Sequence, residues 1–174
     1  MIPRWVVRST FGLALVALAV SVYLTVVHFT TTIALVCSAT DVINCERVTT
    51  SAQSRFLGIP VAVLGLAWSA GMVVLCSPGA WVSGRPWIRT ARLALAGIGM
   101  AFVLWLLYAE LLLIHAICLW CTVVHVATFA LFVLVFVYGW AQEAEAPTAA
   151  DRSGVGDGTG TSTHPGRTDV GSDA

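Results

Sequence analysis

The chain contains no lysine, and its 174 residues include only nine basic and nine acidic side chains. A soluble globular domain carries about a quarter charged residues, so this scarcity argues against a soluble fold. The net charge is zero, and no basic run is present that could follow a nucleic-acid backbone. Hydrophobic residues make up 58% of the chain. The balance favours a protein that lies in a membrane.

The hydrophobic residues are gathered into long runs in which Glu110 is the only acidic or basic side chain. About 20 apolar residues in a helix span the roughly 30 Å of a bilayer core. Because lipid offers no partner to backbone amides, such runs must be helical there. The sequence therefore predicts an all-α membrane protein, a bundle of four transmembrane helices. The predicted spans are residues 10–29, 59–76, 93–114 and 118–140. The first is predicted to be a retained helix, since its apolar stretch exceeds that of a signal peptide.

Arginines flank these spans unevenly. Six lie near one side: Arg4, Arg8, Arg85, Arg89, Arg92 and Arg152, against Arg47 and Arg55 on the other. Positive loops stay in the cytoplasm. We therefore expect both termini and residues 77–92 to be cytoplasmic, in the plasma (inner) membrane of a bacterium. Residues 30–58 and 115–117 would face outward, where disulfides persist.

Two segments lie outside the spans. Residues 141–174 are rich in Gly, Thr, Ser, Ala and Asp, a composition that predicts a disordered cytoplasmic tail. The outward segment Ser38–Ser54 is polar but contains spaced valines and an isoleucine. It predicts a short amphipathic helix along the membrane surface, with an ordinary polar loop as the alternative.

Four of the five cysteines are predicted to lie on the outward side. Cys37 and Cys45 belong to the long loop, and Cys118 and Cys121 form a CxxC at the start of the last span. The first-turn amides of a helix favour a thiolate, and positions three apart can form a disulfide. Two such pairs on one side indicate thiol–disulfide exchange. Cys76 lies near the other side and is predicted to be a buried apolar residue.

Two other interpretations remain open at this point. His115, Cys118, Cys121 and His125 have a spacing that could hold zinc. Alternatively, both cysteine pairs could be static disulfides that join the loops.

Two ionisable side chains extend the CxxC region inward. His125 follows Cys121 by four residues, one turn deeper on the same side of the helix. It could donate to a quinone carbonyl, relay a proton, or simply be a buried histidine. Glu110 lies within the third span at a similar depth, and an ionisable group there is a functional candidate. Proton delivery to a reduced quinone, snorkelling to the interface and a structural hydrogen bond are its three possible roles.

In order along the chain, Cys37-x7-Cys45, CERVTTS, FLGIPVAVLGLAW and CLWC resemble the vitamin K epoxide reductase family over roughly residues 10–140. The resemblance implies four helices around a quinone, menaquinone or ubiquinone, capped by the outward loop. Cys118 and Cys121 would be the active-site pair, with Cys121 nearer the quinone. Cys37 and Cys45 would pass electrons to them from a separate extracytoplasmic thioredoxin-fold (DsbA-like) protein.

The resemblance also places pocket residues. Ser51 matches a family serine between the loop and the quinone pocket, and Ser54 is nearest to the position of a pocket asparagine. His125 replaces a tyrosine of the vertebrate enzymes. These two departures favour quinone reduction in support of disulfide formation over epoxide reduction or quinone recycling.

Overall fold

The computed structural model describes residues 2–30, 43–83 and 85–154. The chain divides into a unit of residues 1–140 and a unit of residues 141–174. Cys37 lies outside the described residues. The first unit contains the helical bundle and all the contacts discussed below.

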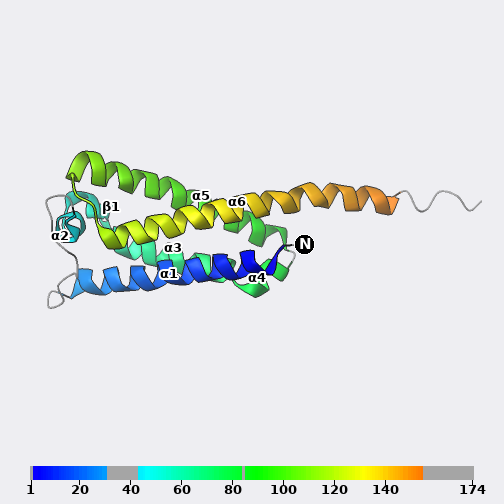
Figure 1. The fold of residues 1–174 in the computed structure, drawn as a ribbon, viewed down its shortest axis with the longest axis horizontal. Helices are drawn as coiled ribbons and strands as arrows, with labels where there is room; N and C mark the ends of the chain where they lie inside the picture. Colours follow the sequence, from blue (N-terminus) through cyan, green and yellow to red (C-terminus); the bar gives the residue numbers. More distant parts are fainter. Residues whose placement is uncertain (1, 31–42, 84, 155–174) are drawn as a thin grey trace, which may run out of the picture. The chain divides into compact units, whose positions relative to one another are not determined.

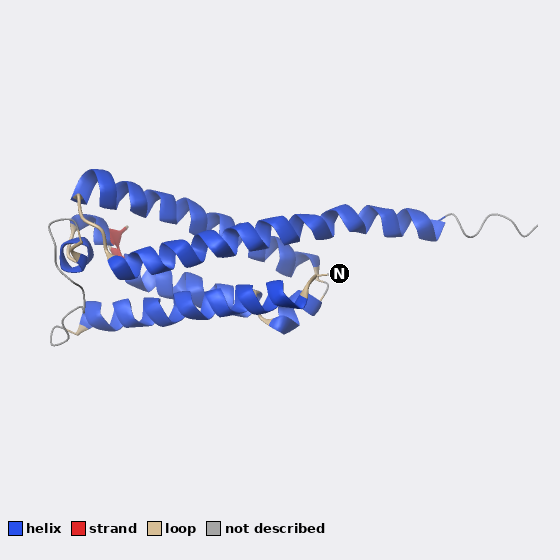
Figure 2. Cartoon of the chain, in the orientation of Figure 1, coloured by secondary structure: helices blue, strands red, loops and turns tan. Residues whose placement is uncertain are grey.

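Long helices dominate the described chain (Figure 2). They are α1 (Arg4–Phe29), α3 (Val61–Leu75), α5 (Pro86–Tyr108) with its π-helical continuation η2 (Ala109–Ile114), and α6 (Leu119–Gly154). Three segments are long and apolar enough to cross a membrane, namely Arg4–Phe29, Pro86–Ile114 and Leu119–Gly139. The protein is therefore an all-α membrane protein. With 15 residues, α3 reaches only about 22 Å, so the predicted second span, residues 59–76, stays a prediction.

The observed helices begin at different residues from the predicted spans. Proline precedes or opens three of the long helices, because α1 follows Pro3, α3 follows Pro60 and α5 begins at Pro86, and proline suits a first helical turn. The helix α3 begins at Val61, two residues later than the predicted span. Residues 59 and 60 belong instead to a two-stranded hairpin, in which β1 (Arg55–Phe56) pairs with β2 (Ile59–Pro60).

The hairpin turn consists of Leu57 and Gly58, both with positive φ angles, 51° and 82°. Positive φ at both central residues is what a tight antiparallel hairpin requires. Leucine is unusual in this conformation, so its side chain gave no sequence signal for a turn. The predicted second span is therefore wrong at its N-terminal end.

Within the first unit, α1 packs along α3, and α3 packs against α5 (Figure 1). The Thr25 hydroxyl donates to the Ala62 carbonyl at 3.2 Å and joins α1 to α3. A buried core farther along these helices contains Ala14, Met72, Cys76, Ala96, Leu131 and Val135. Cys76 is fully buried and free.

Arg92 is buried instead of lying free in a cytoplasmic loop. Its Nε donates to the Leu75 carbonyl at 2.9 Å and its Nη2 to the Ala80 carbonyl at 3.2 Å. The guanidinium stacks on Trp81 of the short helix α4 (Pro78–Val82), 3.5 Å from the ring centroid. These contacts fix the C-terminal end of α3 and α4 to α5.

Residues 141–154 are helical as part of α6, although the sequence predicts an unstructured tail there. Ala and Glu together occupy more than half of positions 141–150, and both have high helix propensity. Residues 155–174 lie outside the described chain.

Candidate redox site and adjoining cavity

The site lies at the end of the first unit where α1 ends, near α2 (Cys45–Thr49) and β1; α4 lies at the other end (Figure 1). Ile43 forms an isolated parallel bridge with Ile117, and the Asn44 amide donates to the Ile117 carbonyl at 3.2 Å. The Asn44 side chain then caps α2 by accepting from the Arg47 amide at 3.0 Å. Because Cys45 follows this cap, the docking sets Cys45 beside the start of α6.

Cys45 and Cys118 belong to one buried cluster. Their exposed fractions are 1% and 0%, and Val48, Ile114 and Ala116 complete the cluster. Cys121 and Trp120 pack against it. Cys45 is disulfide-bonded, whereas Cys118 and Cys121 are free thiols. The structure therefore brings a disulfide and a dithiol together in one water-poor cluster.

Cys118 precedes the apolar span that starts at Leu119. The backbone amide of Cys121 donates a hydrogen bond to the sulfur of Cys118 at 3.3 Å. Hydrogen bonding from the Cys121 thiol, with backbone donors from Cys121 and Trp120 adding to it, outweighs burial and lowers the pKa of Cys118 to about 7. A thiolate is the nucleophile of disulfide exchange, so Cys118 is prepared for that reaction.

The chain enters the CxxC through a tight reversal. The π-helix η2 ends at Ile114 and is followed by His115, whose φ is 54°; the amides of His115 and Ala116 both donate to the Glu110 carbonyl. Trp120, inside the CxxC, packs on Tyr23 of α1 with ring centroids 5.0 Å apart. The reversal and the aromatic contact together fix the first turn of α6 against the bundle.

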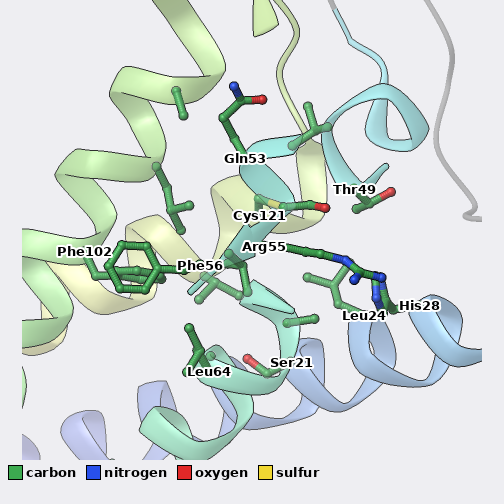
Figure 3. A pocket seen from close by; sticks show the side chains of 18 of the residues that line it. Ser21, Leu24, His28, Thr49, Gln53, Arg55, Phe56, Leu64, Phe102 and Cys121 are labelled. Atoms are coloured by element: carbon green, nitrogen blue, oxygen red, sulfur yellow. The ribbon is translucent and has the colours of Figure 1, made fainter. Parts of the chain in front are cut away.

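A cavity of about 1440 Å³ opens beside the cysteines and is lined by residues from all four long helices and from the hairpin. Of the predicted site residues it contains Cys45, Ser51, Ser54, Glu110, Cys121 and His125. In Figure 3 Cys121 faces this space, Phe56 lies beside Phe102, and Arg55 extends toward His28. The Phe56 and Phe102 rings meet edge to face at 5.6 Å.

His125 is 5% exposed, and its Nδ1 has no hydrogen-bond partner among the described residues. A buried polar atom without a partner is costly. Because His125 lines the cavity, this atom is suited to a polar group of a bound ligand. The large, mostly apolar cavity with an orphaned donor–acceptor atom at its wall fits a quinone ring, whose carbonyls need such a partner.

Ser51 and Ser54 also line the cavity, but their hydroxyls have backbone partners. Ser51 donates to the Val48 carbonyl and Ser54 to the Ser51 carbonyl, each at 2.7 Å. Both bonds close the turns of α2 and of the 3-10 helix η1 (Ala52–Ser54). The two hydroxyl oxygens keep lone pairs as acceptors, while their protons hold the loop over the cavity.

Sequence reasoning missed several lining residues. Ser21 of α1 is 3% exposed and faces Gly65, where an added Cβ would lie 3.5 Å from its hydroxyl. A buried serine in the first span was the available signal. The sequence contains no signal for Arg55, Phe56 or His28, because their positions at the cavity depend on the hairpin. Within the described residues no group of three or more metal-ligating side chains is assembled.

An apolar helical bundle with a disulfide and a CxxC beside a large cavity defines a membrane redox protein. The family model of the vitamin K epoxide reductase family matches residues 9–136, most of the chain. The protein belongs to this family, as its motifs predict. Members are membrane oxidoreductases of disulfide and quinone chemistry. No curated protein matches the chain significantly.

Proposed function

We propose that this protein transfers electrons from a thioredoxin-fold dithiol protein outside the cytoplasm, through its two cysteine pairs, to a membrane quinone. The observation that carries the proposal is the shared burial of Cys45 and Cys118 in one cluster, next to the cavity that Cys121 lines. Disulfide exchange needs direct contact between sulfurs, and the shared cluster supports a route from Cys45 through Cys118 to Cys121.

The burial of Cys45 supports an order for the exchange. A sulfur that is 1% exposed is poorly placed for a partner protein, so the partner dithiol reacts at Cys37 and reduces the Cys37–Cys45 disulfide. The Cys45 thiolate then attacks Cys118 of an oxidised Cys118–Cys121 pair, and Cys121 leaves as a thiolate. Cys37 attacks Cys45, restores the loop disulfide and leaves Cys118 and Cys121 reduced. Two electrons have then moved inward, and every bond broken is matched by one formed.

The quinone site of the proposal is the cavity. Its quinone, when bound, accepts two electrons and two protons. Cys121 lines the cavity whereas Cys118 lies deeper in the cluster, so Cys121 is the sulfur that meets the ring. His125 supplies the orphaned Nδ1 for a carbonyl group. Ser51 and Ser54 hold the loop that covers the cavity.

The orientation is part of the proposal. Arg4, Arg8, Arg85 and Arg89 belong to or flank helix ends opposite the cysteine cluster. Within the described part of the first unit, Arg47 and Arg55 are the only arginines at the cysteine end. The positive-inside rule then puts the cysteines outside the cytoplasm, where a dithiol partner would need reoxidation.

The test uses the full-length protein in detergent or liposomes, with dithiothreitol as electron donor and a short-chain menaquinone or ubiquinone as acceptor. Quinone reduction is followed optically. We expect Cys118→Ser and Cys121→Ser to abolish it, while Cys76→Ser, at the remote core position, retains it. Turnover in either CxxC variant equal to that of the wild type would exclude the mechanism.

A second measurement tests the route itself. In Cys121→Ser, the Cys118 thiol has no partner in the CxxC and should be trapped in a disulfide with Cys45. Non-reducing peptide mapping detects this Cys45–Cys118 bond. A bond from Cys118 to Cys37 in its place would reverse the proposed order of the two loop cysteines.

A further inference from the structure

Glu110 is turned into the molecule although the three leucines that follow it are not. Its exposed fraction is 4%, whereas Leu111, Leu112 and Leu113 are 54%, 60% and 47% exposed. The carboxyl therefore does not snorkel to the outer surface of the bundle. A π-helix adds a residue to the turn and is often found at functional sites, and here it sets one carboxyl on the inner side of η2 with three leucines outside.

The carboxyl lies within charge-interaction range of both sulfurs of the CxxC, Cys118 and Cys121. Glu110 and Cys121 also line the same cavity. Titratable and charged groups on the elements around η2 are Cys45, Glu46 and Arg47 of α2, Cys118, Cys121 and His125 at α6, and Tyr108 and His115 beside η2 itself. Of these, Cys45 and the two CxxC thiols must lose protons in the proposed cycle, and the CxxC thiols are the ones whose oxidation sends electrons to the quinone.

We propose that Glu110 is the proton acceptor of the Cys118–Cys121 pair. The inference rests on the proposed function and adds to it the path of the protons. When the pair is oxidised, two S–H bonds are lost, one S–S bond forms, and two electrons leave for the quinone. The carboxylate of Glu110 takes the proton of Cys121 and becomes a neutral acid on the cavity wall. From there the proton can move to an oxygen of the quinone. The carboxylate of Glu110 can then accept the second proton of the thiol pair.

Three features suit Glu110 to this task. Its carboxyl lies on the wall of the cavity, so a proton held there stays beside the site of reduction. Its backbone carbonyl is fixed by the amides of His115 and Ala116, so the start of its side chain is held. The cluster around it is apolar, and two acidic groups in such surroundings share protons as a coupled pair.

The first test reads thiol reactivity and involves no quinone. The rate of iodoacetamide alkylation of Cys121 is measured by peptide mass spectrometry between pH 5 and 10, in reduced protein that carries Cys118→Ser so that Cys118 adds no step of its own. With Glu110 in place we expect two steps in the pH profile, because two coupled groups titrate. With Glu110→Gln added we expect one. Profiles of the two proteins that superimpose would overturn the inference.

The second test reads turnover with the same donor and acceptor as above. Positioned acid–base groups contribute about 100-fold or more in rate, so we expect Glu110→Gln to slow quinone reduction by about 100-fold near neutral pH with little change in KM. The deficit should shrink as the pH rises, because more thiolate then forms without a base. Glu110→Asp, which keeps the carboxylate, should recover part of the rate. A deficit independent of pH, unrelieved by Asp, would mean a structural role and would overturn the inference.

Glu46→Gln provides the matched control, because Glu46 is an exposed glutamate on the neighbouring helix α2. It should leave the alkylation profile of Cys121 in two steps. Failure of the proposed function is distinguishable: wild-type protein that reduces no quinone would contradict it, while two-step alkylation of Cys121 in the Cys118→Ser protein, reduced to one step by Glu110→Gln, would still support proton sharing between Glu110 and Cys121.

Discussion

The indole of Trp68 lies directly against Gly99, so that a Cβ at position 99 would be 2.5 Å from the ring. The Trp68 Nε1 donates to the Leu95 carbonyl at 2.9 Å, one helical turn away. Trp68 of α3 thus packs tightly against α5 at the wall of the cavity. The contact is possible only because position 99 carries no side chain.

Gly99→Ala should therefore destabilise the protein. Overpacking of this kind costs about 1–3 kcal/mol, because the ring must leave its position and lose its bond to Leu95. The unfolding midpoint in detergent measures the effect. Gly97→Ala is the control, since a Cβ there meets nothing within 4 Å, and it should gain about 0.5–1 kcal/mol of helix stability. A Gly99→Ala protein as stable as Gly97→Ala would contradict the close packing of Trp68 on Gly99.

The pKa of Cys118 provides the second prediction. Because the pKa is lowered to about 7 from 9.0, the thiolate fraction should rise as the pH increases through 7. The alkylation rate of Cys118 in the reduced protein, measured by mass spectrometry, should have its midpoint there. Below this pH the thiol is protonated, and attack of Cys118 on the Cys45 disulfide, the reverse of the proposed inward transfer, should slow by about tenfold per pH unit.

Two substitutions of Cys121 separate the causes of this shift. Cys121→Ala removes the side-chain donor and should move the alkylation midpoint of Cys118 upward, although the backbone donors remain. Cys121→Ser keeps a hydroxyl donor and should keep more of the shift. A midpoint that is the same in both variants would show that the Cys121 side chain does not stabilise the thiolate.

Arg92 gives a prediction about stability far from the redox site. Hydrogen bonds from a charged group contribute about 1.5–3 kcal/mol each, and Arg92 makes two while stacking on Trp81. Arg92→Met should therefore lower the free energy of unfolding by about 3 kcal/mol. Turnover per folded molecule should be unchanged. Arg85→Met removes the same charge from an exposed site, and equal losses of stability in the two variants would contradict the structural role.

The hydrophobic runs and cysteine motifs predicted the helical membrane fold and the family, because length without charge is enough to specify a span. Helix ends were less predictable. Arg4 and Arg8 lie within α1, since their long side chains can extend past the apolar stretch. The sequence did not predict the hairpin, because Leu57, and not a second glycine, adopts positive φ in its turn.

The candidate site, too, could be predicted only in part from the sequence. The CxxC is visible in the sequence, but the approach of Cys45 to Cys118 depends on the Ile43–Ile117 bridge and the Asn44 cap, which are tertiary contacts. The sequence left Glu110 three possible roles. Only the burial of Glu110 beside exposed leucines distinguishes an inward carboxyl from one at the lipid interface.

The last prediction concerns orientation and uses one exposed residue at each end of the bundle. Ala52 lies in η1 near the cysteine cluster, and Ser83 follows α4 at the opposite end; both are exposed. In intact cells, a membrane-impermeant maleimide should label Ala52→Cys above the wild-type background, because the arginines keep the other end in the cytoplasm. Ser83→Cys should be labelled only after permeabilisation. Labelling of Ser83→Cys but not Ala52→Cys in intact cells would invert the topology, place the cysteine pairs in the reducing cytoplasm and remove the basis for an extracytoplasmic dithiol partner.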